Sequence, residues 1–206
     1  YLSQVDGKDK SNFEENLKII NNQIKQIGNL VNEFSDFARM PKPILSENDL
    51  LQIMKENIKL ISELDKDIEL NLKNVSDRVI FKSDKEQLSR VFFNLIKNSI
   101  ESIQQKKEKN LSFHGEISIE ITDNNDHIKI TIIDNGIGFG IIDNKVDDIL
   151  HPYFTTKKNG TGLGLSIVNK IINDHNGKII FTPINDGAKV DIIFNLNDSW
   201  NTYRWW

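Results

Sequence analysis

Two asparagines spaced four residues apart give this 206-residue sequence its first candidate for chemistry. Asn94 and Asn98 lie in an apolar pattern that predicts a long helix over 85–105, so their amides project from one face of that helix. Amide oxygens can coordinate a hard cation such as Mg²⁺, or hold its waters and phosphate oxygens. The alternative is that both amides are buried and hydrogen-bonded to the backbone. Without the other motifs, this structural role is the favoured interpretation.

The stretch D-N-G-I-G at 134–138 is the second candidate, because it stands where a predicted strand over 127–133 gives way to a loop. From there the Asp134 carboxylate can face a cavity and accept a hydrogen bond from an exocyclic amine, worth about 1.5–3 kcal/mol when charge-assisted. Gly136 and Gly138 would let the backbone approach a flat ligand closely. The same string also occurs in ordinary turns.

The glycine-rich stretch N-G-T-G-L-G-L at 159–165 runs directly into a predicted helix over 162–175. Gly160, Gly162 and Gly164 would present free backbone N–H groups at the helix N-terminus, where the helix dipole also favours phosphate. The spacing is superficially that of a dinucleotide-binding turn, but a lysine-rich loop precedes it where that motif requires a strand. The pattern therefore predicts a phosphate site of another kind.

The stretch Y-F-T-T-K at 153–157 precedes these glycines within a segment, 139–160, that shows no sustained period. Such a segment is typical of a long functional loop. Its aromatic residues could clamp a lid, and Lys157 could neutralise a terminal phosphate. The alternative is that Lys157 and Lys158 carry ordinary solvated loop charge.

The elements that must position these motifs follow from the apolar periods after residue 43. Isoleucines alternate along 116–122 and 127–133, which predicts a hairpin with a polar turn at 123–126. The other expected helices and strands are 49–64, 68–73, 79–83, 178–184 and 188–196, the last two forming a second hairpin. This order predicts an α+β fold, a two-layer α/β sandwich with helices on one face of a sheet.

A separate helix is expected over 12–40, ahead of that fold, after a polar turn at 3–11. Its apolar positions alternate by four and three, which is a heptad pattern. They are Phe13, Leu17, Ile20, Ile24, Ile27, Val31 and Phe34. Pro41 and Pro43 end the helix and suggest a domain boundary. A single narrow seam needs a partner helix, although a surface helix folded back on the next domain is the alternative.

Composition narrows the classes of function. The sequence has 26 Lys and Arg against 30 Asp and Glu, and this mildly acidic balance argues against nucleic acid as a partner. With no cysteine, disulfides and sulfur-bound zinc are excluded. No apolar run reaches about 18 residues, so we expect any membrane anchor upstream of Tyr1, in a longer protein. The tail at 198–206 holds all three tryptophans and has no predicted role.

The motifs occur in the order and spacing of the N box, first glycine box, F box and second glycine box of the ATP-binding fold shared by sensor histidine kinases, gyrase, Hsp90 and MutL. From about residue 11 to 197 the sequence resembles the cytoplasmic end of a two-component sensor histidine kinase, which in this family is anchored to the bacterial inner membrane. The helix end V-N-E-F-S-D-F-A-R-M-P-K-P at 31–43 resembles NtrY-like sensors of nitrogen regulation.

This resemblance implies a site for ATP and Mg²⁺. Asn98 would be the metal ligand, Asp134 would read the adenine amino group, and Lys157 would meet the γ-phosphate. The residues implied to bind nucleotide are Asn94, Asn98, Asp134, Gly136, Gly138, Phe154, Thr156, Gly160, Thr161, Gly162, Leu163 and Gly164. Among them Phe154 would anchor the closed lid.

The resemblance also bears on catalysis. ATPases of this superfamily carry at the first N-box position a Glu that activates water, whereas Asn94 cannot take a proton at neutral pH. Asn94 and Lys157 would therefore hold ATP for an external histidine nucleophile. The four histidines, His114, His127, His151 and His175, all lack the context of a phosphoacceptor, so we expect no autophosphorylation.

The implied organisation has three parts: residues 1–40 as the second helix of a dimerisation hairpin, 41–197 as the ATP-binding catalytic domain, and 198–206 as a tail. A homodimer and a response regulator would be the protein partners. Two alternatives stay open, namely a non-catalytic dimerisation or docking module and a gyrase-type ATPase.

Overall fold

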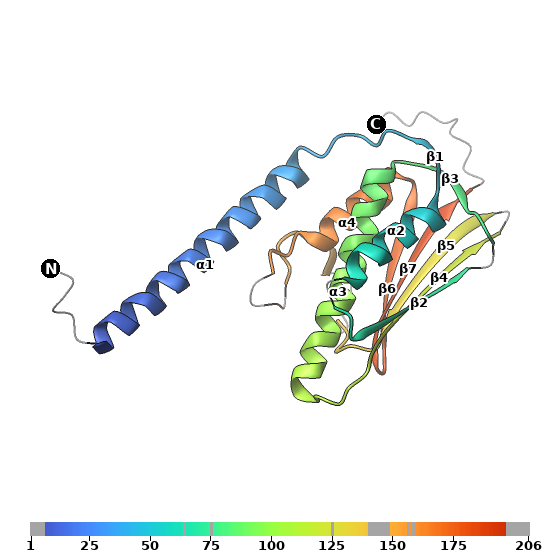
Figure 1. The fold of residues 1–206 in the computed structure, drawn as a ribbon. Coiled ribbons are helices and arrows are strands. Elements are labelled where there is room, and N and C mark those ends of the chain that lie inside the picture. Colours follow the sequence, from blue (N-terminus) through green and yellow to red (C-terminus); the bar gives the residue numbers. More distant parts are fainter. Residues whose placement is uncertain are drawn as a thin grey trace.

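The computed structural model describes residues 7–63, 65–74, 76–124, 126–139, 149–155, 157 and 160–196. A long helix leads into a domain in which helices lie against a sheet (Figure 1). The helices are α1 (Gly7–Ala38), α2 (Leu50–Ser62), α3 (Lys85–Lys109) and α4 (Gly164–Asp174). The strands are β1 (Ser46–Asp49), β2 (Ile68–Asn74), β3 (Ile80–Ser83), β4 (Gly115–Asp123), β5 (His127–Asp134), β6 (Gly177–Ile184) and β7 (Gly187–Asn195).

The main sheet has five strands in the order β2-β4-β5-β7-β6. Both predicted hairpins are present, because β4 pairs antiparallel with β5 and β6 with β7. β2 joins at one edge in parallel with β4, since α3 carries the chain between them. The register sets Ile119 opposite Ile132 and Ile121 opposite Ile130, so the alternating isoleucines share one face.

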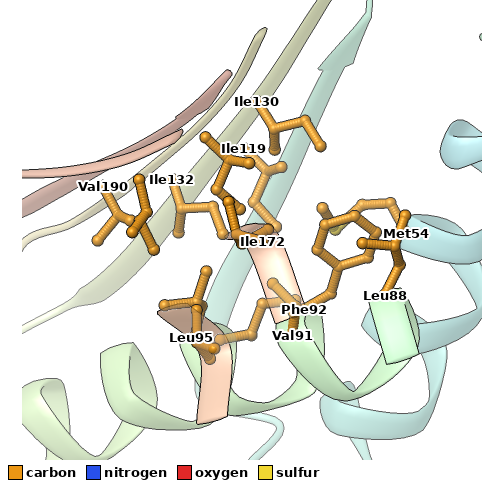
Figure 2. Packing of buried hydrophobic residues seen from close by; sticks show 14 of the residues in the cluster. Met54, Leu88, Val91, Phe92, Leu95, Ile119, Ile130, Ile132, Ile172 and Val190 are labelled. Carbon is orange, nitrogen blue, oxygen red and sulfur yellow. The ribbon is translucent and has the colours of Figure 1, made fainter. Parts of the chain in front are cut away.

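Helices α2, α3 and α4 cover that face and form the core. In Figure 2, Ile119, Ile130 and Ile132 of the sheet lie across from Phe92 and Leu95 of α3. All five side chains are 3% exposed or less. The expected two-layer sandwich is confirmed, and burial of these apolar side chains holds its layers together.

A small second sheet was not predicted. Strand β3 pairs antiparallel with β1, the four residues Ser46–Asp49, and belongs to no part of the five-stranded sheet. β1 has no apolar residue, so no alternating pattern could reveal it. Asp49 explains its place, because the carboxylate accepts hydrogen bonds from Leu51 N, as the N-cap of α2, and from Val79 N.

The start of α3 is fixed by two polar residues. Asp84 caps the helix, its carboxylate accepting a hydrogen bond from Gln87 N at 3.1 Å. The backbone N–H of Asp84 donates to Nε2 of buried His175, just past the end of α4, at 3.0 Å. Nδ1 of the same ring lies 2.8 Å from Ile171 O. His175 therefore ties the beginning of α3 to the end of α4.

Helix α1 begins at Gly7, so residues 7–11 are helical and the expected turn over 3–11 is wrong there. Its heptad seam is exposed along its length, with Phe13 58% and Ile24 62% exposed. Toward its end it contacts the domain, where Phe37 packs against the core. No helix in the part of the chain that the structure describes is long and apolar enough to cross a membrane. The tail at 198–206 lies outside the described residues.

Candidate nucleotide site

One face of α3 positions the predicted site. Asn94, Asn98 and Ser102 recur every four residues, so their side chains follow one another along that face. Each meets a different segment of the chain: Ser102 meets the end of β5, Asn98 meets Lys157, and Asn94 faces the start of α4. Segments far apart in the sequence are thereby collected along a single helix.

Asp134 ends β5 as predicted, and its carboxylate is buried, 5% exposed. Oδ1 accepts a hydrogen bond from Gly136 N at 3.0 Å and lies 3.5 Å from the Ser102 hydroxyl. Burial raises the pKa of Asp134, although the hydrogen bonds from Gly136, Ser99 and Ser102 oppose the rise. The structure thus keeps an acceptor with strong hydrogen-bonding character in a protected place.

The glycines that follow Asp134 are required by the protein's own packing. A Cβ at Gly136 would lie 2.7 Å from the backbone carbon of Ser102 and 2.8 Å from Ile103 N, so this turn rests directly on α3. Gly138 has φ +74°, and its Cβ would lie 2.7 Å from Gly187 O in the β6–β7 turn. Both positions need glycine to let backbones meet.

Lys106 is a residue of this site that sequence reasoning missed. Its ammonium donates to Asn135 O at 2.6 Å and to Gly136 O at 3.2 Å, and it pairs with Asp186. It also lies 4.4 Å from the ring centroid of Phe113. Lys106 therefore holds the turn after Asp134 to α3 from behind. The sequence does offer one signal for this role. Lys106 follows Ser102 by four residues, so it lies on the same face of α3 as Asn94 and Asn98.

Asn98 and Lys157 are brought together as expected for one site. The Lys157 ammonium donates to Asn98 Oδ1 at 3.0 Å and also pairs with the Glu101 carboxylate. Lys97 lies 3.8 Å from the other oxygen of Glu101. Lys157 is thus bound to α3, and the alternative of a freely solvated loop charge does not describe it.

Asn94 and Asn98 are unlike a structural amide elsewhere in the domain. Buried Asn57 donates to Ile53 O at 2.9 Å and to the Ser89 hydroxyl, which is the backbone-bonded arrangement considered above. Within the described residues no hydrogen bond joins Asn94 or Asn98 to the backbone. A Cβ at Gly164 would lie 3.8 Å from Asn94 Oδ1, so this amide faces the start of α4.

The second glycine stretch forms a tight pair of turns. Gly162 has φ +71° and its carbonyl accepts a hydrogen bond from Tyr153 N at 3.0 Å, while Tyr153 itself has φ +70°. A Cβ at Gly162 would lie 2.4 Å from the carbonyl carbon of Tyr153. The Thr161 hydroxyl, next to this turn, donates to Glu33 of α1. Glycine is therefore needed here to let the backbone at Tyr153 lie against the turn that leads into α4.

The remaining predicted residues take varied places. Leu163 is fully buried and precedes α4, and a Cβ at Gly160 would lie 2.4 Å from the Thr155 hydroxyl. Phe154 is 42% exposed, so it packs only in part. Thr156 lies outside the described residues. A cavity of about 360 Å³ near the end of α1, lined by Phe37 and Leu150 among others, contains none of the predicted nucleotide residues.

The chemical character of the site changes from one end of this face of α3 to the other. A buried carboxylate with hydroxyl neighbours lies at the Ser102 end, suited to accept from a neutral amine. Two amides, the Lys157 cation and the N-terminus of α4 lie toward the Asn94 end, suited to anionic oxygens and a hard cation. A ligand with a base at one end and phosphates at the other matches this order.

Comparison with known proteins agrees with a nucleotide site. Residues 83–198 match the family described as histidine kinase-, DNA gyrase B-, and HSP90-like ATPase. The chain is 33% identical over 190 residues to a sensor histidine kinase described as NtrY-like from Rickettsia felis, covering 92% of this chain and 30% of that protein. It is 31% identical to the nitrogen regulation protein NtrY of Azorhizobium caulinodans, covering 87% of this chain and 23% of that protein. The chain thus spans less than a third of the length of these relatives.

Solved structures agree with the fold. The catalytic domain of the histidine kinase ThkA superimposes with a TM-score of 0.63 at 27% identity, covering 73% of this chain and 95% of that one. ThkA in complex with the response regulator TrrA gives 0.71 at 21% identity, covering 94% and 53%. With a family model that matches more than half of the sequence, this chain belongs to the histidine kinase-, DNA gyrase B- and HSP90-like ATPase family, and its domain is similar to the catalytic domains of histidine kinases.

Proposed function

We propose that this domain binds ATP with Mg²⁺ and presents the γ-phosphoryl group to a histidine on a dimerisation helix, for relay to an aspartate of a response regulator. The observation that carries the proposal is the convergence of three segments of the chain on successive turns of α3, through Ser102, Asn98 and Asn94. A single nucleotide can reach all three, because they lie on one helix face.

The adenine would bind at the Asp134 end. Asp134 would accept a hydrogen bond from the exocyclic amine, and Gly136 and Gly138 would line the pocket. Burial of the carboxylate strengthens such a contact because the local dielectric is low. Ser102 and Lys106 would position the acceptor and its turn without contacting the base.

The residues at the other end suit Mg²⁺ and phosphates. Asn98 Oδ1 already accepts a hydrogen bond from an ammonium, so this hard oxygen is aimed at a cation, as a metal ligand must be. Asn98 would hold the ion and Asn94 would support ion and phosphates. When bound, Mg²⁺ neutralises phosphate charge and aligns the triphosphate. Gly160, Gly162 and Gly164, with Thr161 and Leu163, would hold phosphates at the N-terminus of α4.

The lid residues would complete the site once nucleotide is bound. Lys157 would meet the γ-phosphate, and Phe154 and Thr156 would contribute to closure over it. Asn94 cannot act as a general base, so attack by water would be slow and the phosphoryl group would be kept for a better nucleophile. This feature favours a kinase over a gyrase-type ATPase.

His175 is a poor phosphate acceptor, because both of its ring nitrogens have partners in the interior. The sequence around His114, His127 and His151 lacks the phosphoacceptor motif. We therefore propose that the histidine belongs to a different helix and that residues 1–40 supply the second helix of its dimerisation hairpin, with the catalytic domain over 41–197. Incubation with γ-labelled ATP should leave this chain unlabelled, and stable label on any of its histidines would contradict the proposal.

Calorimetry with a non-hydrolysable ATP analogue and Mg²⁺ tests the binding itself. The parent should give heat that the Asp134→Ala variant loses. The rival function is a non-catalytic dimerisation or docking module, which the exposed seam of α1 favours. If the parent gives no binding to nucleotide at any concentration while remaining folded, the rival stands.

A further inference from the structure

The Lys157 ammonium occupies an oxygen pair on α3 that combines one amide and one carboxylate. Asn98 Oδ1 accepts its hydrogen bond at 3.0 Å, and Glu101, one turn further along the helix, pairs with the same nitrogen. The side chains of Lys157 and Glu101 are each about one third exposed, so their contact is partly shielded from water. A lid residue thereby spans 56 positions of sequence to reach the helix.

Glu101 has a cation as its partner in this structure, the Lys157 ammonium. A carboxylate next to the place proposed for a triphosphate would repel the nucleotide if it stood alone. Lys97 lies 3.8 Å from one of its oxygens but is itself half exposed, so its charge is well screened. Lys157 is the closer cation, and it bridges Glu101 to the amide proposed as metal ligand.

The oxygen pair has the character of a magnesium site. Amide and carboxylate oxygens are the hard donors that Mg²⁺ selects, and Asn98 and Glu101 are three residues apart, on one side of α3. The cation present in this conformation, the tethered ammonium, stands for the charge that a metal would bring. This inference rests on the function proposed above. It gives Glu101 a part in metal binding in addition to that of the amides of Asn94 and Asn98.

We propose that Glu101 is a further binding group for Mg²⁺, directly or through its water, and that Lys157 is a tethered substitute cation that Mg²⁺ displaces. Without nucleotide, Lys157 neutralises the pair and holds the lid segment to α3. With Mg²⁺ and nucleotide bound, Asn98 and Glu101 would hold the metal, and the Lys157 ammonium would be free to pair with the terminal phosphate. Exchange of one cation for another couples metal loading to movement of Lys157.

The Mg²⁺ requirement for ADP binding separates this exchange from a simple ion pair. ADP lacks the γ-phosphate, so its binding reports the metal site without the proposed Lys157–γ-phosphate contact. Calorimetric titrations of ADP at a series of Mg²⁺ concentrations give the Mg²⁺ level for half-maximal affinity. Glu101→Gln should raise that level about tenfold, because a charged ligand is lost. Lys157→Gln should lower it several-fold, because the competing cation is gone.

A matched control and a metal-free arm complete the test. Glu108→Gln removes the same charge from an exposed position of the same helix and should leave the Mg²⁺ requirement unchanged. In EDTA, Glu101→Gln should bind ADP more tightly than the parent, because Lys157 loses its carboxylate partner and its positive charge is no longer neutralised beside the phosphates. Circular dichroism melts confirm that each variant is folded.

The outcomes distinguish this inference from the proposed function. If the parent binds Mg-ADP but both variants shift the Mg²⁺ requirement in the same direction, or Glu101→Gln behaves like Glu108→Gln, the cation exchange is wrong and the nucleotide site stands. If the folded parent binds no nucleotide with or without Mg²⁺, the proposed function itself fails.

Discussion

The Thr161 hydroxyl, beside the glycine turn that begins α4, donates a hydrogen bond to the Glu33 carboxylate on α1, 128 residues earlier in the sequence. The same hydroxyl oxygen lies 3.4 Å from Leu163 N, whose N–H donates to it. A carboxylate from the heptad helix therefore lies at the end of α4 where the proposed function puts phosphates. Anions favour this position because of the helix dipole.

Glu33→Gln should therefore increase nucleotide affinity. Removing the negative charge eliminates its repulsion of a phosphate, and we expect a gain of about two- to fivefold, as for a partly exposed charge at a helix end. Calorimetry with Mg-ATP analogue at low and high salt measures it, and the gain should shrink as salt rises. Glu14→Gln, at an exposed position near the other end of α1, is the control. An equal gain in both variants would show a general charge effect instead.

Asp134→Asn should weaken nucleotide binding while making the folded domain more stable at neutral pH. Burial raises the pKa of Asp134, so the folded state holds its proton more tightly than the unfolded state does, and the parent loses stability as pH rises through that pKa. The amide removes this cost. Loss of a charge-assisted hydrogen bond should lower ATP affinity roughly 10- to 100-fold. Calorimetry and urea unfolding at pH 7 measure the two effects.

Asp191 offers the matched comparison with opposite sign. It is 7% exposed; burial raises its pKa, but hydrogen bonds from Thr131, Lys129 and Lys189 outweigh burial, so the pKa is lowered overall. Its contribution to stability is present at neutral pH and is lost as pH falls through the folded pKa. Asp191→Asn should destabilise the domain by about 1–3 kcal/mol and leave nucleotide affinity unchanged. A stability gain in Asp191→Asn, or a loss in Asp134→Asn, would contradict these assignments.

Gly136→Ala should be far more damaging than Gly164→Ala. A methyl group at 136 meets the backbone of Ser102 and Ile103, which cannot move without shifting α3, and such overpacking costs about 1–3 kcal/mol. At 164 the nearest atom is Asn94 Oδ1 at 3.8 Å, which is ordinary contact. Urea unfolding gives the stability difference. Equal stability of the two variants would mean that the turn does not rest on α3 as described.

The sequence predicted the framework because its signals are periodic. Alternating isoleucines specify which face of β4 and β5 is buried, and the i, i+4 spacing of Asn94 and Asn98 places both on one face of α3. β1 could not be predicted because its four residues are polar. The strand is held by tertiary contacts, namely the hydrogen bond from Val79 N to the Asp49 carboxylate and the pairing with β3. Lys106 was missed because a lysine on a helix is ordinarily solvent-exposed.

The glycines show that a sequence can indicate where no side chain fits without indicating which neighbouring group excludes it. Gly136 and Gly138 are predicted to give room for a flat ligand, and the structure adds a second need, because their backbones lie against α3 and Gly187. A sequence motif reports that no side chain fits, not what occupies the space. Only the packing of α3 and of the β6–β7 turn supplies that information, and both lie far from these glycines in the sequence.

His175 should make the stability of the domain depend on pH in the weakly acidic range. Burial lowers the pKa of His175, although its contact with Ile171 O and the nearby Asp84 and Asp174 oppose the shift. The neutral ring can donate from Nδ1 to Ile171 O and accept at Nε2 from Asp84 N. Above the unfolded value of about 6.5 this contribution is complete, and it is lost as pH falls toward the folded pKa, because the unfolded chain takes up a proton first.

Urea unfolding of the parent between pH 5 and 8 should therefore show stability falling below about pH 6.5. His175→Gln should remove that part of the slope and cost about 1–3 kcal/mol at pH 8, because Asp84 N loses a buried acceptor. His151→Gln, on the exposed lid, should keep the parent slope. An unchanged slope in His175→Gln would mean that the acid sensitivity arises elsewhere and that the link between the start of α3 and the end of α4 does not depend on a neutral imidazole.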